Sequence, residues 1–547
     1  MTPSDDFAFI PLGGTGEIGM NLNVYRCDGK LLAVDCGIGF AGGDTPGVDI
    51  LVPDPAWLVE HRKDLLGLVI THAHEDHIGG VAHLWRSLQC PVHGGPFVSA
   101  VLRRKLAEAG LSQEVPLKEF DLPGRVRIGP FDLEFLRVAH SVPEALAMAI
   151  RTRHGLVVHT GDWKLDPEPL IGPPTDEAGF RRLGGEGVLA MVCDSTNAMV
   201  EGHSGSEAEV RRSLAKLIKP MKGRVAVTCF ATNLARVESI ALAGLAAGRD
   251  VALFGRSLRN SVQAARECGY LSRIPDFVSE DEAGYIPDDN LLVICTGSQG
   301  EERSALAKLA TDTHNNLSLG QGDTVIFSSR QIPGNERAIT RVQDELARRG
   351  VRVVTADEHF VHVSGHPARE ELRALYDWVK PRAAIPVHGE WRHMDAHATL
   401  AREAGSEPLV IEDGAVVRLA PGPVQVVDTV PVGRLAVDGT RLLPVRGGVL
   451  GARGRLGREG AVVASLALDA QGKLLGAPRV SAPGLFDAEG PELAQMGEEL
   501  ARALNELPKA ARRDDEVVGE AARAVLRKAV GRRAKKRPNV EVHLLRV

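Results

Sequence analysis

The sequence lacks the features that mark membrane, secreted and disulfide-rich proteins. No apolar run reaches the ~18–20 residues that a membrane span needs, and the first residues lack the apolar segment of a secretory signal. The seven cysteines are an odd number, are widely spaced and form no Cys-x-x-Cys pair, which argues against a disulfide scaffold and a zinc ribbon. These absences predict a cytoplasmic protein with reduced thiols and no membrane association.

The sequence also lacks a strong net charge. The formal charge of -6 over 547 residues gives no general attraction to a polyanion. One segment departs from this balance, because residues 523–537 contain eight basic residues and no acidic one. Such a segment is either a solvated helix face or a patch that attracts nucleic acid phosphates, and the sequence leaves both interpretations open.

The apolar runs indicate an α/β protein of several domains. Residues 1–202 hold strand-length runs with helical stretches between them. From about residue 203, short strands alternate with helices, which predicts βαβ units and a parallel sheet. Residues 431–460 are rich in Gly and Arg and indicate an extended linker. Residues 461–547 predict a small α+β domain with a hairpin, two helices and a final strand.

The strongest chemical signal is THAHEDHIGG at residues 71–80, directly after a predicted strand. Residues two apart in an extended segment point to the same side, so His72 and His74 can bind one ion. The chain then turns into a helix, where Asp76 and His77 can face a second ion. Imidazole and carboxylate ligands favour zinc or manganese over calcium or magnesium. Four ligand-type residues in six positions therefore predict a metal site.

Further ligand-type residues end other predicted strands. His140, Asp162 and His388 each follow an apolar run, at the strand tips where loops of α/β proteins gather functional groups. Asp35 ends the run LLAVD, and as a buried carboxylate it is expected to orient a ligand histidine through a hydrogen bond.

This pattern resembles the metallo-β-lactamase superfamily. The long gap between Asp162 and His388 has room for an inserted βαβ sheet, which resembles the β-CASP nucleases. Asp194 in VCDSTNA, His366 in HVSGHP and His388 in PVHGE are similar to motifs A, B and C of that branch. The segments GGTGEIGMN, CFATNLARV, CTGSQGE and SSRQIPGNE resemble the bacterial ribonuclease J family, and the similarity runs along nearly the whole chain.

The resemblance implies an α/β fold with a known domain order. We expect a metallo-β-lactamase αββα sandwich, an inserted parallel α/β β-CASP domain and a small α+β C-terminal domain. The expected boundaries are 1–202 for the first part of the sandwich, 203–350 for the insertion, 351–430 for the second part of the sandwich, 431–460 for the linker and 461–547 for the C-terminal domain.

The resemblance also implies two divalent metal ions per subunit, zinc or alternatively manganese. It assigns His72, His74 and His140 to one ion, Asp76, His77 and His388 to the other, and Asp162 to both. In a two-metal site the ions neutralise the attacked phosphate and activate water. Asp162, His366 and Asp194 are the implied catalytic residues: His366 contacts the scissile phosphate and assists the leaving oxygen, while Asp194 orients either His366 or a metal ligand.

A pocket for the RNA 5′-monophosphate is implied as well. It is formed by residues matching Ala231, Thr232 and Asn233 and by the segment His362, Val363, Ser364, Gly365 and His366. A Ser-Gly turn beside a catalytic histidine offers backbone N–H and hydroxyl donors to a phosphate. For His362, an ordinary structural role stays an equal alternative.

The implied function is a cytoplasmic ribonuclease in mRNA decay and RNA maturation. It degrades single-stranded RNA from 5′-monophosphate ends in the 5′→3′ direction and has additional endonuclease activity. The family likeness implies a homodimer, or a dimer of dimers, through the C-terminal domain, and gives no helicase or ribosome partner. The alternatives are a purely endonucleolytic or DNA-directed β-CASP nuclease, a small-molecule metallo-hydrolase on the same site, and an inactive RNA-binding scaffold.

Two glycine-rich segments have competing interpretations. Residues 14–19 spell Gly-x-Gly-x-x-Gly, but a dinucleotide site needs a helix after the glycines, and the sequence here predicts a hairpin. We therefore expect these glycines to serve close backbone packing near the site. CTGSQGE at residues 295–301 is either a tight βα turn or a loop whose N–H groups face the RNA.

Overall fold

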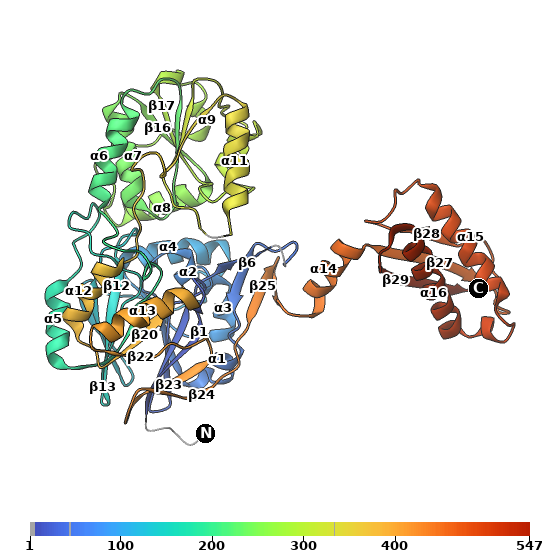
Figure 1. Ribbon diagram of the computed structural model, residues 1–547, viewed down its shortest axis with the longest axis horizontal. Coiled ribbons are helices and arrows are strands. Elements are labelled where there is room, and N and C mark those ends of the chain that lie inside the picture. Colours follow the sequence, from blue (N-terminus) through green and yellow to red (C-terminus); the bar gives the residue numbers. More distant parts are fainter. Residues whose placement is uncertain (1–5, 43–44, 333) are drawn as a thin grey trace. The chain divides into compact units, whose positions relative to one another are not determined.

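A computed structural model describes residues 6–42, 45–332 and 334–547 (Figure 1). The chain divides into two compact units. The first comprises Met1–Gly39 and Val52–Val432, and the second comprises Phe40–Leu51 and Gly433–Val547. No helix in the described part of the chain combines the length and apolarity that crossing a membrane requires.

The first unit is built on two sheets that pack face to face. The first sheet has the order β24-β23-β1-β3-β4-β7-β8-β9, with β24 Gln425–Thr429, β23 Ala415–Ala420, β1 Phe7–Gly13, β3 Leu22–Cys27, β4 Lys30–Val34, β7 Leu65–Val69, β8 Val92–Gly94 and β9 Leu117–Glu119. The Asp28-Gly29 turn joins β3 to β4 in the hairpin that the sequence predicts.

The second sheet supplies the other half of the sandwich. Its order is β10-β11-β12-β13-β14-β20-β22, with β10 Gly124–Ile128, β11 Phe131–Arg137, β12 Leu146–Thr152, β13 Gly155–His159, β14 Val188–Asp194, β20 Ala383–Val387 and β22 Glu407–Pro408. Between the sheets, Phe9 and Tyr25 share one buried apolar cluster with Phe135 and Met148. Helix α4 (Pro96–Glu108) packs on β8 and β9, and α13 (Trp391–Glu403) packs on β20 and β22. The predicted αββα sandwich is confirmed.

A separate parallel sheet forms the insertion between β14 and α12 (Arg369–Val379). Its order is β16-β17-β15-β18-β19, with β15 Val225–Thr228, β16 Asp250–Phe254, β17 Leu291–Cys295, β18 Thr324–Phe327 and β19 Arg352–Val354. Every pairing in it is parallel, as the alternation of strands and helices predicts. The helices around it are α6 Glu207–Ile218, α7 Leu234–Ala246, α8 Arg256–Glu267, the short α9 Glu280–Ala283, α10 Ala305–Ala310 and α11 Glu336–Arg348.

The insertion also contacts the sandwich through side chains, away from the two places where the backbone connects the two domains. Helix α8 packs against α4, where Arg104 forms an ion pair with Glu267. Beyond the end of α8, Tyr270 donates a hydrogen bond to Glu144 Oε1 at 3.1 Å. The two domains of the first unit are therefore joined both by the backbone and by side chains.

The expectation of an extended linker at residues 431–460 is wrong. Strands β25 (Arg434–Asp438) and β26 (Arg441–Pro444) form an antiparallel hairpin, and α14 (Gly448–Glu459) follows. Asp438 accepts hydrogen bonds from Arg441 at 2.7 Å and from Arg453 at 2.8 Å. The Gly and Arg content suggested a linker, but Asp438-Gly439 forms a turn between two short strands, and Arg441 and Arg453 pair with Asp438.

The C-terminal domain in the second unit has the predicted α+β composition. Strand β27 (Ala461–Leu468) lies between β28 (Arg479–Ser481) and β29 (Asn539–Arg546), and its parallel pairing with β29 brings the chain end into the sheet. Helices α15 (Pro491–Glu506) and α16 (Asp515–Ala534) bury Leu500 and Leu526 in the same apolar cluster as Val462.

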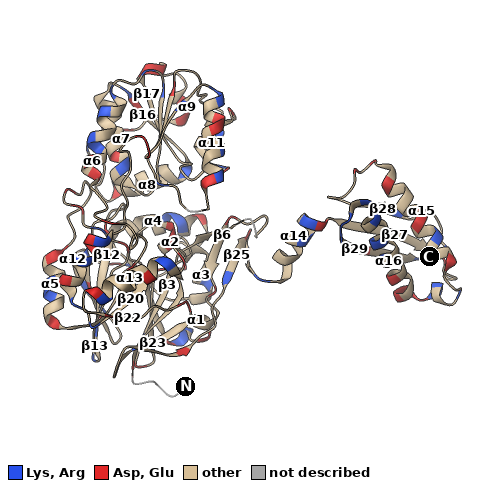
Figure 2. Cartoon of the chain, in the orientation of Figure 1, with Lys and Arg blue, Asp and Glu red and all other residues tan. Residues whose placement is uncertain are grey.

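The basic segment 523–537 lies on α16 and in the residues after it. Arg532 and Arg533 both pair with Glu499, and Arg523 pairs with Glu520. Figure 2 shows basic and acidic residues interspersed on the helices of the chain. Ion pairs therefore occupy three of the eight basic residues, and both interpretations of the segment stay open.

Candidate metal centre

The candidate metal centre forms where strands of both sheets end. His72 and His74 follow β7, and His74 directly precedes the short helix α2 (Glu75–Ile78). The loop packs tightly on the neighbouring one, because a Cβ on Gly37 would lie 1.7 Å from the carbonyl oxygen of Asp76. Glycine is therefore required where the two loops cross.

The other ligand-type residues end strands of the second sheet. His140 follows β11, Asp162 follows β13 and His388 follows β20. His388 and Asp35 both have left-handed backbone conformations, with φ of 53° and 62°. Non-glycine residues adopt this region rarely, and such strain clusters at functional sites.

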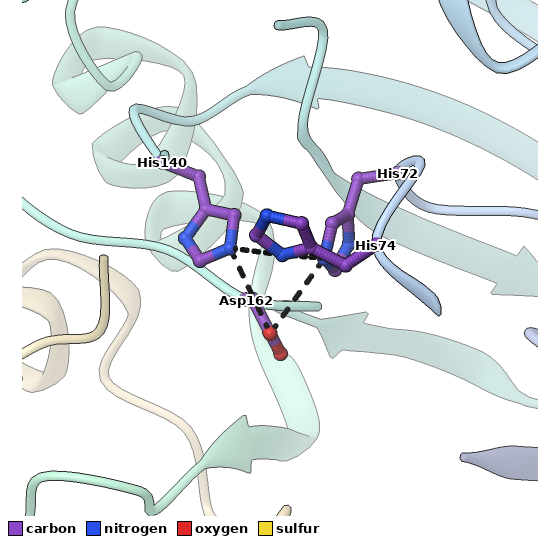
Figure 3. A group of neighbouring side chains, drawn as sticks. All are labelled: His72, His74, His140 and Asp162. Carbon is purple, nitrogen blue, oxygen red and sulfur yellow. Dashed lines mark hydrogen bonds and ion pairs between the residues drawn. The ribbon is translucent and has the colours of Figure 1, made fainter. Parts of the chain in front are cut away.

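The first group of side chains is His72, His74, His140 and Asp162, whose donor atoms lie within 4.8 Å of one another. Nδ1 of His74 is 3.1 Å from Nε2 of His72 and 3.0 Å from Nε2 of His140. Asp162 Oδ2 lies 3.7 Å from His72 and 3.8 Å from His140. Figure 3 shows the three rings and the carboxylate pointing toward one another.

The second group is Asp76, His77, Asp162 and His388. Asp162 Oδ2 lies 3.2 Å from Nε2 of His77, and Asp76 Oδ2 lies 3.1 Å from Nε2 of His388. Asp162 thus belongs to both groups. All seven residues that the resemblance names as metal ligands converge, in the two sets that it implies.

A divalent ion fits the chemistry of these donors. Asp162 Oδ2 is buried and makes no hydrogen bond to the described residues, an orphaned acceptor that a cation would satisfy. Burial lowers the pKa of His72 and His140 well below their ordinary value, and that of His74 to about 4. These three rings are therefore neutral at pH 7, the state in which imidazole binds a metal.

The second group carries positive charge on its rings in the absence of an ion. Burial lowers the pKa of His77, but Asp162 and Asp76 outweigh it and raise the pKa well above its ordinary value. His388 shows the same balance, with Asp162 as the main opposing carboxylate. The pKa of Asp162 is in turn low, because the histidines outweigh its burial. Protons on His77 and His388 thus balance the negative charge of Asp76 and Asp162, which a bound metal ion would otherwise neutralise.

In each ligand histidine, one ring nitrogen forms a hydrogen bond with an oxygen atom of the protein. His77 Nδ1 donates to Asp35 Oδ2 at 2.8 Å, as the sequence predicts for Asp35, and His140 Nδ1 donates to the carbonyl of Gly365 at 2.6 Å. The other three contacts are Thr71 Oγ1 with His72 Nδ1 at 3.0 Å, Ser141 Oγ with His74 Nε2 at 3.2 Å and Thr196 Oγ1 with His388 Nδ1 at 2.8 Å. Such contacts orient metal-binding histidines and fix their tautomers.

Asp194 orients two histidines at once. Its Oδ2 accepts from Nδ1 of His366 at 2.8 Å, and its Oδ1 accepts from the hydroxyl of Thr196 at 2.7 Å. Thr196 in turn accepts from Nδ1 of His388. The sequence leaves a choice between His366 and a metal ligand as the partner of Asp194, and the geometry provides both. Burial lowers the pKa of His366, but Asp194 and Asp162 outweigh it and raise the pKa.

The predicted phosphate segment 362–366 lies against the metal centre. Ser364 Oγ accepts from Asn197 Nδ2 at 2.7 Å and from the backbone N–H of His366 at 3.1 Å. A Cβ on Gly365 would lie 2.8 Å from Cε1 of His140, so glycine is required there. Val363 is buried, and His362 lies 3.4 Å from the Arg236 guanidinium.

The residues Ala231, Thr232 and Asn233 lie between β15 and α7. Ala231 and Thr232 are partly exposed, but the side chain of Asn233 caps α7 by accepting from the N–H of Arg236 at 3.0 Å. The backbone N–H of Asn233 also donates to the carbonyl of Phe230 at 3.1 Å, so local hydrogen bonds restrict the substrate role expected of Asn233.

The Gly-x-Gly-x-x-Gly segment is not followed by a helix. It leads into β3, and the carbonyl of Gly14 accepts from the N–H of His388 at 2.7 Å. Asn21, just after the segment, donates to the carbonyl of Asp76 at 3.0 Å. These glycines support the metal-binding loops, as predicted. Thr71, Asn21, Ser141 and Thr196 are contributors that the sequence reasoning missed, although all but Asn21 are adjacent or nearly adjacent to predicted site residues.

Comparison with protein families gives four matches in chain order. The metallo-β-lactamase superfamily matches residues 24–228, and the β-CASP domain of ribonuclease J matches residues 222–346. The Zn-dependent metallo-hydrolase RNA specificity domain matches residues 350–411, and the ribonuclease J C-terminal domain matches residues 448–547.

Curated relatives match along the whole chain. Ribonuclease J of Sinorhizobium meliloti is 45% identical, and the alignment covers 100% of this chain and 98% of the relative. The chain belongs to the ribonuclease J family. Ribonuclease J of Mycolicibacterium smegmatis is 39% identical over 97% of this chain and 95% of its own length. Ribonuclease J2 of Bacillus subtilis is 33% identical over 92% and 91%.

A solved structure supports the fold alone. A protein of unknown function from Enterococcus faecalis is 15% identical and covers 76% of this chain and 100% of its own, with a TM-score of 0.53. Membership of the ribonuclease J family makes the chain a metal-dependent nuclease of the β-CASP type. The predicted family is confirmed, and the His/Asp cluster is its candidate site for divalent ions.

Proposed function

We propose that the chain is a two-metal ribonuclease that degrades RNA in the 5′→3′ direction, prefers 5′-monophosphate ends and also cleaves internally. The observation that carries this proposal is the sharing of Asp162 between two donor groups, with His366 directly beside them. Two adjacent divalent ions, when bound, neutralise phosphate charge and supply a nucleophile at neutral pH.

Each residue has a defined task in this proposal. His72, His74 and His140 would hold one ion, Asp76, His77 and His388 would hold the other, and Asp162 would serve both. Three neutral imidazoles in the first group favour zinc, and manganese is the alternative with the same ligand types.

His366 acts on the substrate rather than on an ion. Because Asp194 accepts from its Nδ1, the ring holds a proton there and presents Nε2 for a phosphate oxygen or the leaving oxygen. The raised pKa of His366, due to Asp194 and Asp162 outweighing burial, favours the protonated form that a general acid needs.

The preference for a 5′ monophosphate rests on the turn at residues 362–366. Ser364 Oγ accepts two hydrogen bonds from the protein, and its hydroxyl hydrogen has no acceptor among the described residues, so it can donate to a phosphate. In this proposal Ala231 and Thr232, which are partly exposed, add backbone donors from the insertion, and Asn233 positions them as the cap of α7. A phosphate held beside the metal centre favours removal of nucleotides one at a time from the 5′ end.

The wider setting of the proposal follows the family. We propose action in the cytoplasm in mRNA decay and RNA maturation, and a homodimer or dimer of dimers held by residues 461–547. The domain boundaries expected from the sequence belong to the same proposal, except for the folded segment at residues 431–460.

The deciding experiment compares one RNA with a 5′ monophosphate and the same RNA with a 5′ triphosphate, each labelled at its 3′ end. We expect stepwise shortening from the monophosphate end and slower attack on the triphosphate. Equal rates and internal products alone would identify an endonuclease. A single-stranded DNA of the same sequence and a thioester substrate test the remaining enzyme classes, and turnover of either in place of RNA would overturn the proposal.

A further inference from the structure

Two motifs of the insertion are not explained by the metal centre. CTGSQGE follows β17, and residues 328–332 of SSRQIPGNE follow β18. These two strands flank β15, so both segments lie at the carboxyl edge of the parallel sheet. CTGSQGE is not a tight turn into a helix, because α10 begins only at Ala305. Neither segment is therefore explained by helix initiation or by metal binding.

The two loops are fastened to each other. Gln299 Nε2 donates to the carbonyl of Arg330 at 2.9 Å, and Gln299 Oε1 accepts from the N–H of Ile332 at 2.9 Å. A Cβ on Gly300 would lie 2.4 Å from the backbone of Ala338, so the first loop also packs closely on α11. Gln299 thereby fixes the backbone on both sides of residue 331.

This arrangement directs Arg330 toward the catalytic turn. Its Nη1 donates to Asn197 Oδ1 at 3.3 Å. Asn197 Nδ2 donates in turn to Ser364 Oγ at 2.7 Å and to the carbonyl of His366 at 3.1 Å. The guanidinium is thus two hydrogen bonds from His366, although 36 residues separate the two positions in sequence.

Arg330 differs from the other cations around this turn. Arg236 is fully buried and pairs with Glu207 at 2.8 Å, and Lys164 is buried and pairs with Asp166 at 3.1 Å. Arg330 is exposed, and among the described residues no carboxylate lies within 4.0 Å of it. Its positive charge is therefore not compensated by the protein.

The field of Arg330 reaches the predicted phosphate pocket. The pKa of His362 lies well below its ordinary value because of burial, with Arg236 and Arg330 as the next causes. Arg330 also contributes to the low pKa of His393 at the start of α13, after burial and Arg392. An uncompensated cation in this position attracts an anion to the turn.

We propose that Arg330 binds a phosphate of the RNA strand next to the bond that is cleaved, and that Gln299 is a positioning residue for it. This inference rests on the proposed ribonuclease function and extends it to a substrate contact from the insertion. A guanidinium carries five N–H donors in a planar fork that matches two phosphate oxygens. Among the described residues, the Arg330 guanidinium donates one hydrogen bond, to the neutral amide of Asn197, and its other N–H groups can bind a ligand.

The first experiment measures kcat and KM of Arg330→Ala and Arg330→Lys on 5′-monophosphate RNA. Arg348→Ala is the matched control, because it removes one exposed charge from the same domain, on α11, at a side chain that is 72% exposed. We expect KM to rise about tenfold in Arg330→Ala, as for the loss of a hydrogen bond to a charged group, with kcat little changed. Arg330→Lys should fall in between, since it keeps the charge but loses the fork.

A salt series separates a phosphate contact from a structural role. RNA affinity is measured in an inactive His366→Ala background with and without Arg330→Ala. One lost contact to single-stranded RNA should make the slope of log affinity against log salt less negative by about 0.7. Metal content per chain should be the same in both proteins.

A double-mutant cycle tests Gln299. If Gln299 acts through Arg330, Gln299→Ala should raise KM in the wild type and add nothing in Arg330→Ala. Full additivity would show that Gln299 serves the loop in some other way and would overturn its assignment.

Two results would overturn the Arg330 proposal. One is an Arg330→Ala protein with the KM and salt slope of the wild type. The other is a protein that loses kcat and metal ions at unchanged KM, which would make Arg330 a support for Asn197. Both require a wild type that cleaves RNA. A wild type that does not cleave RNA would instead refute the proposed function.

Discussion

The sandwich and the insertion contribute to the candidate site in different ways. The sandwich supplies all seven predicted metal ligands, and each of its five ligand histidines has its second nitrogen beside a protein oxygen. The insertion and the residues that follow it supply residues 231–233, Arg330 and the turn at 362–366. Arg330 is exposed and most of the others are partly exposed, whereas Asn233 and Val363 are buried. Rigid buried groups suit ion binding, whereas accessible groups suit a long polymeric substrate.

The largest effect is expected from Asp162→Ala. Because Asp162 belongs to both donor groups, its loss should abolish RNA cleavage and reduce the metal content of both sites. Metal analysis of the purified variant and an RNA cleavage assay check this. A variant that keeps two ions per chain would show that the groups do not depend on a shared carboxylate.

His366→Ala separates the substrate-facing histidine from the ligands. We expect cleavage to fall by ~10²–10⁴-fold, the usual contribution of a positioned general acid, with metal content unchanged. Activity and metal content are measured on the same preparation. Loss of the ions in this variant would show that His366 is a ligand.

Arg236→Ala tests the buried ion pair between Arg236 on α7 and Glu207 on α6. Arg236 donates to Glu207, to Ser328 and to the carbonyl of Val361. Removing one partner leaves Glu207 buried without its cation, which costs ~3–5 kcal/mol in the free energy of unfolding. Denaturant unfolding measures it, with Arg348→Ala as the exposed control. A loss below about 1 kcal/mol would mean that Glu207 finds another partner.

Thr196→Val should have the smallest of these effects. It removes the hydroxyl between Asp194 and His388 at nearly constant volume, and such supporting contacts cost about 10–100-fold in metal affinity. Thr196→Ser keeps the hydroxyl and should restore affinity. Competition with a chelator measures both variants. Equal loss in the Ser variant would assign the effect to packing.

Local patterns predict much of the fold. The Asp28-Gly29 hairpin, the strand before His72 and the parallel sheet of the insertion are all confirmed, since each depends on residues close in sequence. The β25–β26 hairpin was missed because its Asp-Gly turn lies in a segment of linker-like composition.

The candidate site was only partly accessible to the same reasoning. Spacing alone predicts the cluster at residues 72–77, while the grouping of all seven ligands came from the family resemblance. The hydrogen bonds that orient the ligand histidines could not be predicted from sequence spacing, because their partners are far apart in the chain. Gly365 reaches His140 across 225 positions, and Thr196 reaches His388 across 192. The substrate role that the resemblance implies for Asn233 stays a prediction, and the structure adds a helix-capping role for its side chain.

The central claim is that two ions occupy the ends of the sandwich strands around one shared aspartate. Anomalous diffraction at the zinc or manganese edge, on crystals of the purified protein, tests it most directly. The account predicts two peaks per chain, one among His72, His74 and His140 and one among Asp76, His77 and His388, with Asp162 in contact with both. A single peak, or peaks away from Asp162, would contradict it.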